Sequence, residues 1–229
     1  MKRRSDKIDF SSVLAAAVHD MKNSLSLLIQ SIEELESTLK ENDIGIDKAA
    51  SIHYQAARLN TGLIQLLSLY RAQINDLPLD IDEHYLDDVL DDIVAANQNH
   101  ISTRTFDIQI KQEDDLYWYF DLDLVNVLIN DMLVNAMRYG NNKLLINVYE
   151  EDNFLHFKIE DDGPGFPEAM LNVAESKLST LDISAGRTGL GLFFARLIAE
   201  AHKSDDRVGS IELENGGTLG GGVFTLKLP

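Results

Sequence analysis

The sequence DMLVNAMRYG, residues 131–140, places polar side chains on a helical pattern that is otherwise apolar. Asp131 and Asn135 stand four residues apart, so their side chains project from one face of the helix. Carboxylate and amide oxygens suit a hydrated Mg²⁺ ion. Arg138 and Tyr139 follow and offer a cation for a phosphate and a ring for a base. Taken alone, the stretch also fits an ordinary helix with scattered polar positions.

A second polar stretch, DDGPG at residues 161–165, ends the strand pattern FLHFKIED. Gly163 and Gly165 allow the backbone to approach a ligand closely, because glycine has no Cβ. A buried Asp161 carboxylate can accept a hydrogen bond from an exocyclic amine. The alternative is a tight turn between two strands, since Asp-Gly is a frequent turn sequence.

A third stretch, GRTGLGL at residues 186–192, leads directly into the helical pattern FFARLIAEAH. A glycine-rich loop before a helix presents free N–H groups and the positive end of the helix dipole to phosphates. The candidate nucleotide-binding residues of this loop are Arg187, Thr188, Gly189, Leu190 and Gly191. One such loop is weak evidence, but here it is the third of three stretches in order.

The segment 76–229 alternates strand and helix patterns. Period-2 alternation predicts strands in TFDIQIKQ, KLLINVYE and FLHFKIED, with a last strand in GGVFTLKLP. The acidic run NDLPLDIDEHYLDDVLDD predicts a linker and then a helix capped at Asp82 or Glu83. The later helix, DLVNVLINDMLVNAMRYG, is expected to start near Asp121 or Asp123. This order predicts an α+β sandwich, in which a mixed sheet carries its helices on one face.

The segment 1–75 has a different pattern, in which apolar residues are spaced alternately four and three apart. One series runs over 14–39 and another over 52–70. This heptad spacing predicts two helices, joined by a turn in ENDIGID, with Asp47 as the N-cap of the second helix. A lone helical hairpin leaves apolar surface uncovered, so we expect residues 11–71 to form a dimeric four-helix bundle with a second copy.

Three polar residues, His19, Asp20 and Asn23, fall inside the first of these helices. His19 follows a seam position and is therefore expected at the solvent-accessible edge of the bundle. A neutral imidazole can act as a nucleophile, and Asp20 could hold the other ring nitrogen and accept its proton. Asn23 lies one turn further along the same face. The alternative is an ordinary exposed histidine on a solvated helix face.

The stretches HDMKN, DMLVNAMRYG, DDGPG and GRTGLGL, in this order, resemble the H, N, G1 and G2 boxes of sensor histidine kinases of two-component systems. The ordered set is far more specific than any one stretch. HDMKN resembles the phosphoacceptor box of the dimerisation and phosphotransfer hairpin. The other three resemble boxes of the GHKL-type ATP-binding domain, which is shared with DNA gyrase. The resemblance implies a phosphotransfer domain over 1–75 and an ATP-binding catalytic domain over 76–229.

The resemblance implies roles for the polar residues of the hairpin. His19 would be the phosphoacceptor, and Asp20 would be the neighbouring base that activates it. Asn23 matches the position that orients water when a response regulator is dephosphorylated. The implied function is that of an ATP-dependent protein-histidine kinase, which phosphorylates itself on His19 and passes the phosphoryl group to an aspartate of a response regulator.

The resemblance also implies a site for ATP and Mg²⁺. Asp161 would accept from the adenine amine, Tyr139 would lie near adenine, and Asn135 would bind Mg²⁺. Asp131 stands where many members carry asparagine, and a carboxylate there keeps a metal-binding or base role available. The residues that would shape the pocket and the lid hinges are Gly163, Gly165, Gly189 and Gly191. Arg187 stands where a glycine often begins the G2 box, and it could reach the phosphates or stiffen the lid.

Two other functions fit parts of the sequence. A histidine phosphotransfer adaptor would keep the hairpin and have a degenerate nucleotide domain, but this chain keeps the glycine-rich stretches. A non-kinase ATPase of the same fold would not need a heptad hairpin that carries HDMKN.

Composition limits the partners and the location. Among 229 residues, 38 acidic and 20 basic side chains give a formal net charge of −18, which disfavours nucleic acid and anionic membranes as partners. The sequence has no cysteine and no apolar run of the roughly 18 residues that a membrane span needs. We therefore expect a cytoplasmic protein. Few residues precede the hairpin, so a separate sensory protein or subunit is expected.

Overall fold

The computed structural model describes residues 46–73, 77–104, 106–171 and 190–229, together with residues 21, 25, 28–30 and 32. The chain divides into two compact units, Met1–Leu77 and Pro78–Pro229. The boundary lies at Pro78, where a proline removes a backbone donor and favours an extended chain. Among the described helices there is no candidate for a transmembrane span.

The described part of the N-terminal unit is helical. Helix α2 spans Ile46–Gln73, and residues 21, 25, 28–30 and 32 are helical as well. Asp47 lies inside α2, so its predicted role as the N-cap is wrong. The helix dipole favours an aspartate in the first turn as well as at the N-cap. The local sequence therefore did not decide at which residue α2 begins. The rest of the first predicted helix lies outside the described residues.

The apolar seam of α2 divides into a covered and an open set. The covered residues are seven apart: Ala56, which is buried, and Leu63 and Tyr70, which are half-buried. The open residues are also seven apart, with exposed fractions of 55% for Ile52, 63% for Leu59 and 48% for Leu66. Met21 and Leu28, another pair seven apart, are exposed too. One apolar stripe of this unit is therefore uncovered in the single chain.

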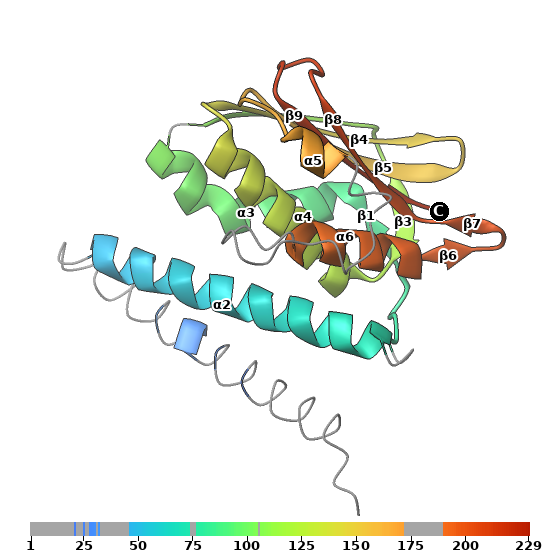
Figure 1. Ribbon diagram of the computed structural model, residues 1–229, viewed down its shortest axis with the longest axis horizontal. Helices are drawn as coiled ribbons and strands as arrows, with labels where there is room; N and C mark the ends of the chain where they lie inside the picture. The colour runs from blue at the N-terminus through green and yellow to red at the C-terminus, as the bar shows by residue number, and fades with distance from the viewer. Residues whose placement is uncertain are drawn as a thin grey trace, which may run out of the picture. The chain divides into compact units, whose positions relative to one another are not determined.

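The described residues of the C-terminal unit form a five-stranded mixed sheet (Figure 1). In spatial order the strands are β2 (Asp107–Gln112), β4 (Lys143–Glu151), β5 (Phe154–Asp161), β9 (Gly222–Leu228) and β8 (Ser210–Asn215). Strands β2 and β4 are parallel, and the other neighbours are antiparallel. All but β8 coincide with strand patterns recognised in the sequence.

Helices cover one side of this sheet, as predicted. They are α3 (Leu86–Arg104), α4 (Leu122–Tyr139) and α6 (Leu190–Ala201), which lie together in Figure 1. A single turn, α5 (Glu168–Leu171), follows the DDGPG stretch. The unit also has two short antiparallel ribbons, β1 (Asp82–Tyr85) with β3 (Tyr117–Phe120) and β6 (Lys203–Ser204) with β7 (Arg207–Val208).

The predicted helix start at Asp82 or Glu83 is wrong, because these residues belong to β1. Residues 82–85 pair with β3, with Asp82 opposite Phe120. The helix begins only at Leu86, whose side chain is fully buried. The acidic sequence suits a helix start, but the pairing strand lies more than thirty residues away and has no local signature.

The core between α4 and β5 lies next to two of the candidate functional stretches, residues 131–140 at the C-terminal end of α4 and residues 161–165 at the end of β5. The buried residues of α4 recur at helical spacing: Val125, Leu128, Ile129, Met132, Leu133, Ala136 and Met137. On β5, the alternate residues Leu155, Phe157 and Ile159 are buried. Full burial of each large apolar side chain stabilises the fold by about 1.5–3 kcal/mol. Asp161 is the next residue on this face of β5, so a carboxylate follows the buried apolar side chains at the end of the strand.

Candidate nucleotide-binding site

Asp161 is the buried carboxylate of this site, with 7% of its surface exposed at the end of β5. Its Oδ1 accepts hydrogen bonds from the backbone N–H groups of Gly163 (2.7 Å) and Gly222 (3.2 Å). Its backbone oxygen accepts from the N–H of Gly221 at 3.1 Å. No donor among the described residues reaches Oδ2. The side chain is therefore held by one oxygen, and the other can accept from a ligand amine.

Glycines surround this carboxylate because there is no room for side chains. A Cβ on Gly163 would overlap the carbonyl oxygen of Tyr139 and stand 2.9 Å from Asp161 Oδ1. A Cβ on Gly221 would overlap the backbone oxygen of Asp161, and one on Gly222 would stand 2.8 Å from Asp161 Oδ2. The last turn of α4, the end of β5 and the start of β9 thus meet with backbone against backbone. This close approach explains the glycines of DDGPG and of the GGG run before β9.

Asp162 fastens the end of α4 to the same turn. Its carboxylate accepts from the backbone N–H groups of Asn141 (2.8 Å), Asn142 (3.0 Å) and Lys143 (3.1 Å). Partial burial favours a higher pKa for Asp162, but these three N–H donors outweigh it and lower the pKa below its usual range. The carboxylate is therefore ionised at neutral pH. Sequence analysis missed this residue, although it is the second acid of the Asp-Asp pair.

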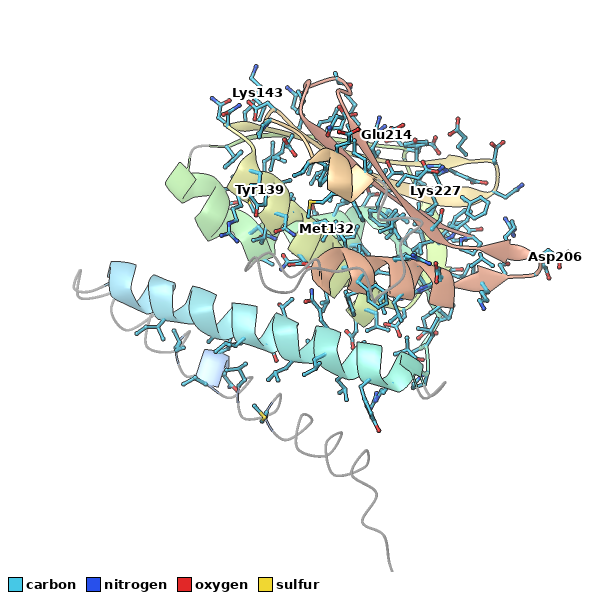
Figure 2. The ribbon with its side chains drawn as sticks, in the orientation of Figure 1. Met132, Tyr139, Lys143, Asp206, Glu214 and Lys227 are labelled. Carbon is cyan, nitrogen blue, oxygen red and sulfur yellow. The ribbon has the colours of Figure 1, made fainter. Side chains whose placement is uncertain are left out.

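The predicted N-box residues lie along α4 beside this turn. The helix is capped by Asp121, whose Oδ1 accepts from the N–H of Leu124 at 3.0 Å. Asn135 is half-buried, and Tyr139, labelled in Figure 2, is exposed at the C-terminal end of the helix. The guanidinium of Arg138 lies 5.6 Å from the centre of the Tyr139 ring. The backbone of Tyr139 lies beside the Asp161 turn, because a Cβ on Gly163 would overlap the carbonyl oxygen of Tyr139.

Asp131 lies against the first turn of α6. A Cβ on Gly191 would overlap Asp131 Oδ2 and stand 3.5 Å from Met132 Cε. The glycine of the G2 stretch therefore lets the start of α6 approach the N-box helix. Leu190 is the first residue of α6, whereas Arg187, Thr188 and Gly189 lie outside the described residues, as do His19, Asp20 and Asn23.

A metal ion would have few protein ligands here. In the described part of the chain, no three His, Cys, Asp or Glu side chains gather to hold an ion. Mg²⁺ is commonly held by one or two protein oxygens together with phosphate oxygens and water. The half-buried Asn135 and Asp131, one turn apart on α4, fit that limited role.

Gly165 and Asn215 close the turn after the DDGPG stretch. Gly165 has a φ of +80°, which glycine adopts without strain, and a Cβ there would stand 2.5 Å from Asn215 Oδ1. The Asn215 amide accepts from the Phe166 N–H at 2.7 Å and donates to the Phe166 carbonyl at 2.9 Å. The backbone of this turn is thus fixed by a side chain of β8, a strand that sequence analysis did not find.

Three comparisons with known proteins agree with this geometry. Residues 120–229 match the family described as histidine kinase-, DNA gyrase B-, and HSP90-like ATPase. The nisin biosynthesis sensor protein NisK of Lactococcus lactis is 29% identical over 88% of this chain and 46% of its own length. The signal transduction histidine-protein kinase AfsQ2 of Streptomyces coelicolor is 26% identical over 92% of this chain and 40% of its own length.

Solved structures share the fold. The histidine kinase AdeS of Acinetobacter baumannii superposes with a TM-score of 0.60 at 20% identity, over 92% of this chain and 96% of that chain. The catalytic domain of histidine kinase ThkA gives a TM-score of 0.54 at 22% identity, over 66% of this chain and 96% of that domain.

The C-terminal unit is therefore an ATPase domain of the GHKL class. The chain carries this ATPase domain and is similar to sensor histidine kinases along most of its length, which confirms the resemblance recognised in the sequence. The chain spans less than half the length of the two curated relatives described above.

Proposed function

We propose that this chain is an ATP-dependent protein-histidine kinase that phosphorylates His19 and passes the phosphoryl group to an aspartate of a response regulator. The imidazole nitrogen of His19 attacks the γ-phosphorus of ATP, the bond from that phosphorus to the ADP oxygen breaks, and Asp20 accepts the imidazole proton. In the second step the regulator aspartate attacks the phosphorus and the P–N bond breaks. Most of the catalysis in such transfers is positioning and electrostatic stabilisation.

The observation that carries this proposal is the carboxylate of Asp161. One oxygen is fixed by two glycine N–H groups, and the other is left to accept from the exocyclic amine of adenine. The carbonyl of Tyr139 lies against Gly163 and the Tyr139 ring is exposed, so the ring suits a place beside the base. The Asp161 carboxylate as a hydrogen-bond acceptor, the Tyr139 ring and the closely packed glycines together support a purine nucleotide as the substrate.

The phosphates and Mg²⁺ would lie toward α6. Asn135 and Asp131 would hold the metal, which neutralises phosphate charge when bound. Arg138 supplies a cation near the C-terminal end of α4, and the glycine loop with Arg187 and Thr188 would close over the phosphates. The close approach of Gly191 to Asp131 supports this placement, because it puts the start of α6, where the glycine loop ends, beside the proposed metal-binding residues.

The N-terminal unit, residues 1–75, would dimerise through 11–71 and present His19. The uncovered stripe of α2 supports this proposal, because Ile52, Leu59 and Leu66 expose apolar surface at heptad spacing. A second copy would cover that stripe in a four-helix bundle. A separate sensory protein or subunit would regulate the kinase, and Asn23 would support dephosphorylation of the regulator. The reaction would take place in the cytoplasm, where ATP is available.

The proposal is tested by incubating the purified chain with γ-labelled ATP and Mg²⁺. The expected label on the protein is stable in base and lost in acid, as for a phosphohistidine. His19→Gln should abolish the label without changing ATP affinity. His53→Gln, a change of another histidine in the same unit, is the matched control and should keep the label.

Two outcomes would contradict the proposal. Label that persists in the His19→Gln variant would place the acceptor elsewhere. ATP turnover to free phosphate with no protein-bound label, in the wild type, would instead favour a non-kinase ATPase.

A further inference from the structure

The β1–β3 ribbon carries three exposed tyrosines on one face. Tyr85, Tyr117 and Tyr119 have exposed fractions of 53%, 49% and 54%. Tyr85 stands opposite Tyr117 in the ribbon, with ring centres 6.0 Å apart, and Tyr117 lies 6.3 Å from Tyr119 in an edge-to-face arrangement. These three residues, called the tyrosine face below, form one continuous aromatic surface.

The opposite face of the same ribbon is anchored in the unit. Phe120 is fully buried, and its ring lies 5.0 Å from that of His84. The indole N–H of Trp118 donates to the carbonyl of Pro229 at 3.3 Å. Because alternate residues of a strand point to opposite sides, this packing fixes the tyrosine face outward on a firm support.

Glu83 lies beside the tyrosine face, and the sequence on either side of the ribbon strands is rich in acidic residues. Tyr119 donates its hydroxyl proton to Glu83 Oε2 at 2.5 Å. This bond and the charge of Glu83 raise the pKa of Tyr119, so the phenol stays neutral. From Asp80 to Asp92, seven of thirteen residues are acidic and none is Lys or Arg. Three more exposed acids precede β3: Glu113, Asp114 and Asp115.

No cation of the described residues covers these rings. The cation–π contacts found in that part of the chain join Arg138 to Tyr139 and Arg207 to Phe154, with 5.6 and 5.8 Å from the guanidinium carbon to the ring centre. Neither involves the tyrosine face. In the described part of the chain, the two arginines with cation–π contacts thus lie on other rings, and the three tyrosines are exposed.

We propose that the tyrosine face binds an arginine-rich segment of a partner protein. A guanidinium stacks flat on a tyrosine ring and simultaneously pairs with a carboxylate, which a lysine ammonium does less well. The acids repel nucleic acid and anionic lipid and attract a cationic chain. Charge and ring geometry therefore select the same class of partner.

The test measures binding of a fluorescein-labelled hexa-arginine peptide to the full 229-residue chain by fluorescence anisotropy at 0.15 M salt. The arginine peptide should bind about tenfold more tightly than hexa-lysine, because each stacked guanidinium adds affinity. The triple variant Tyr85→Thr, Tyr117→Thr and Tyr119→Thr keeps the net charge and a strand-favouring residue. It should lose about tenfold in affinity for the arginine peptide and should no longer distinguish it from the lysine peptide.

Matched controls separate the tyrosine face from the net charge of the protein. Glu83→Gln removes the carboxylate that bonds to Tyr119 and should weaken binding of the arginine peptide several-fold. Asp206→Asn removes the same charge from the β6–β7 turn, where Figure 2 labels Asp206, and should leave binding unchanged. Trp118 fluorescence reports whether each variant keeps the ribbon folded; if the triple variant unfolds, the single variant Tyr85→Thr replaces it, with a loss of a few-fold expected.

Three results would overturn the proposal. The first is equal affinity of wild type and folded tyrosine variants for hexa-arginine. The second is equal loss in the two charge variants, which would reduce the effect to net charge. The third is several-fold tighter binding after deletion of residues 2–7, which would mean that the chain's own Lys2, Arg3 and Arg4 occupy the tyrosine face.

Discussion

The Nε2 atom of His202 accepts a hydrogen bond of 3.0 Å from the backbone N–H of Asp121. The other ring nitrogen, Nδ1, lies 2.8 Å from the carbonyl oxygen of Ile198 and so carries the proton. His202 follows the last residue of α6, and Asp121 caps α4. Asp121 Oδ2 also accepts from the N–H of Asp80 at 3.0 Å. One neutral imidazole therefore ties the end of the G2 helix to the start of the N-box helix.

This bond predicts a pH dependence of stability. Burial lowers the pKa of His202. The hydrogen bond to Ile198 and the nearby Asp121 charge raise it by less, so the pKa lies below its usual value. The unfolded chain takes up a proton below about pH 6.5, whereas the folded state resists protonation, so stability is full above that pH and falls below it. His202→Gln should cost about 1–3 kcal/mol at pH 7.5 and should show a smaller further loss at pH 5.5 than the wild type.

Urea unfolding followed by the single tryptophan, Trp118, checks this in the C-terminal unit. His156 is also buried, and burial and Lys227 lower its pKa, but it is present in both proteins and cancels in the comparison. An equal loss between pH 7.5 and 5.5 in wild type and variant would contradict the assignment of the pH dependence to His202.

Asp161→Asn tests base recognition without emptying the site. The asparagine oxygen can keep the bonds from Gly163 and Gly222, but its amide then points a donor at the adenine amine. We expect a loss of about 10- to 100-fold in ATP affinity, which corresponds to one hydrogen bond to a charged group. Calorimetric titration measures it, and Asp152→Asn, in the exposed turn between β4 and β5, is the control. Unchanged affinity in Asp161→Asn would refute the role.

Two helical glycines should respond oppositely to alanine. A Cβ on Gly191 would overlap Asp131 Oδ2, so Gly191→Ala should displace the Asp131 carboxylate or the start of α6 and reduce ATP affinity. A Cβ on Gly62, in α2, would meet nothing within 4 Å, so Gly62→Ala should stabilise that helix by up to about 1 kcal/mol. Thermal unfolding by circular dichroism and nucleotide titration measure the pair. Normal ATP binding by Gly191→Ala would show that α6 need not approach Asp131.

The open stripe of α2 predicts the oligomeric state. Leu59→Glu places a charge on its most exposed apolar residue and should convert a dimer to a monomer at micromolar concentration. Val208→Glu changes an exposed apolar residue of the C-terminal unit and should leave the dimer intact. Light scattering on a sizing column distinguishes the two. A wild type that elutes as a monomer would contradict the prediction.

Asn23→Ala should separate the two activities proposed for the hairpin. An amide one turn beyond His19 can position water without acting as a nucleophile, so the variant should keep autophosphorylation but slow the loss of phosphate from a phosphorylated regulator. The assay mixes phospho-regulator with ADP and either protein. Equal decay with both, when the wild type is faster than buffer, would leave Asn23 as a solvated helix residue.

The sequence by itself determined the elements whose signal is local. Period-2 alternation found β2, β4, β5 and β9, and the helical spacing of apolar residues found α4. Its start was expected near Asp121 or Asp123, and the structure shows that Asp121 is the cap. The order of the polar stretches was enough to recognise the family, because each stretch is contiguous and its chemistry needs neighbouring residues. These features depend on interactions within a few residues along the chain.

Only the tertiary structure decided what depends on distant partners. The residues of β1 were predicted to start a helix because their strand partner, β3, lies far along the chain. Strand β8 was missed because SIELEN, although it alternates polar and apolar residues, contains only two apolar residues. The supports of the site, Asp162, Asn215 and His202, bond to residues 21, 49 and 81 positions away. Each of these polar groups could have another partner in another fold. The packing of α4, α6 and the sheet therefore decides the partners, which cannot be read from the neighbouring sequence.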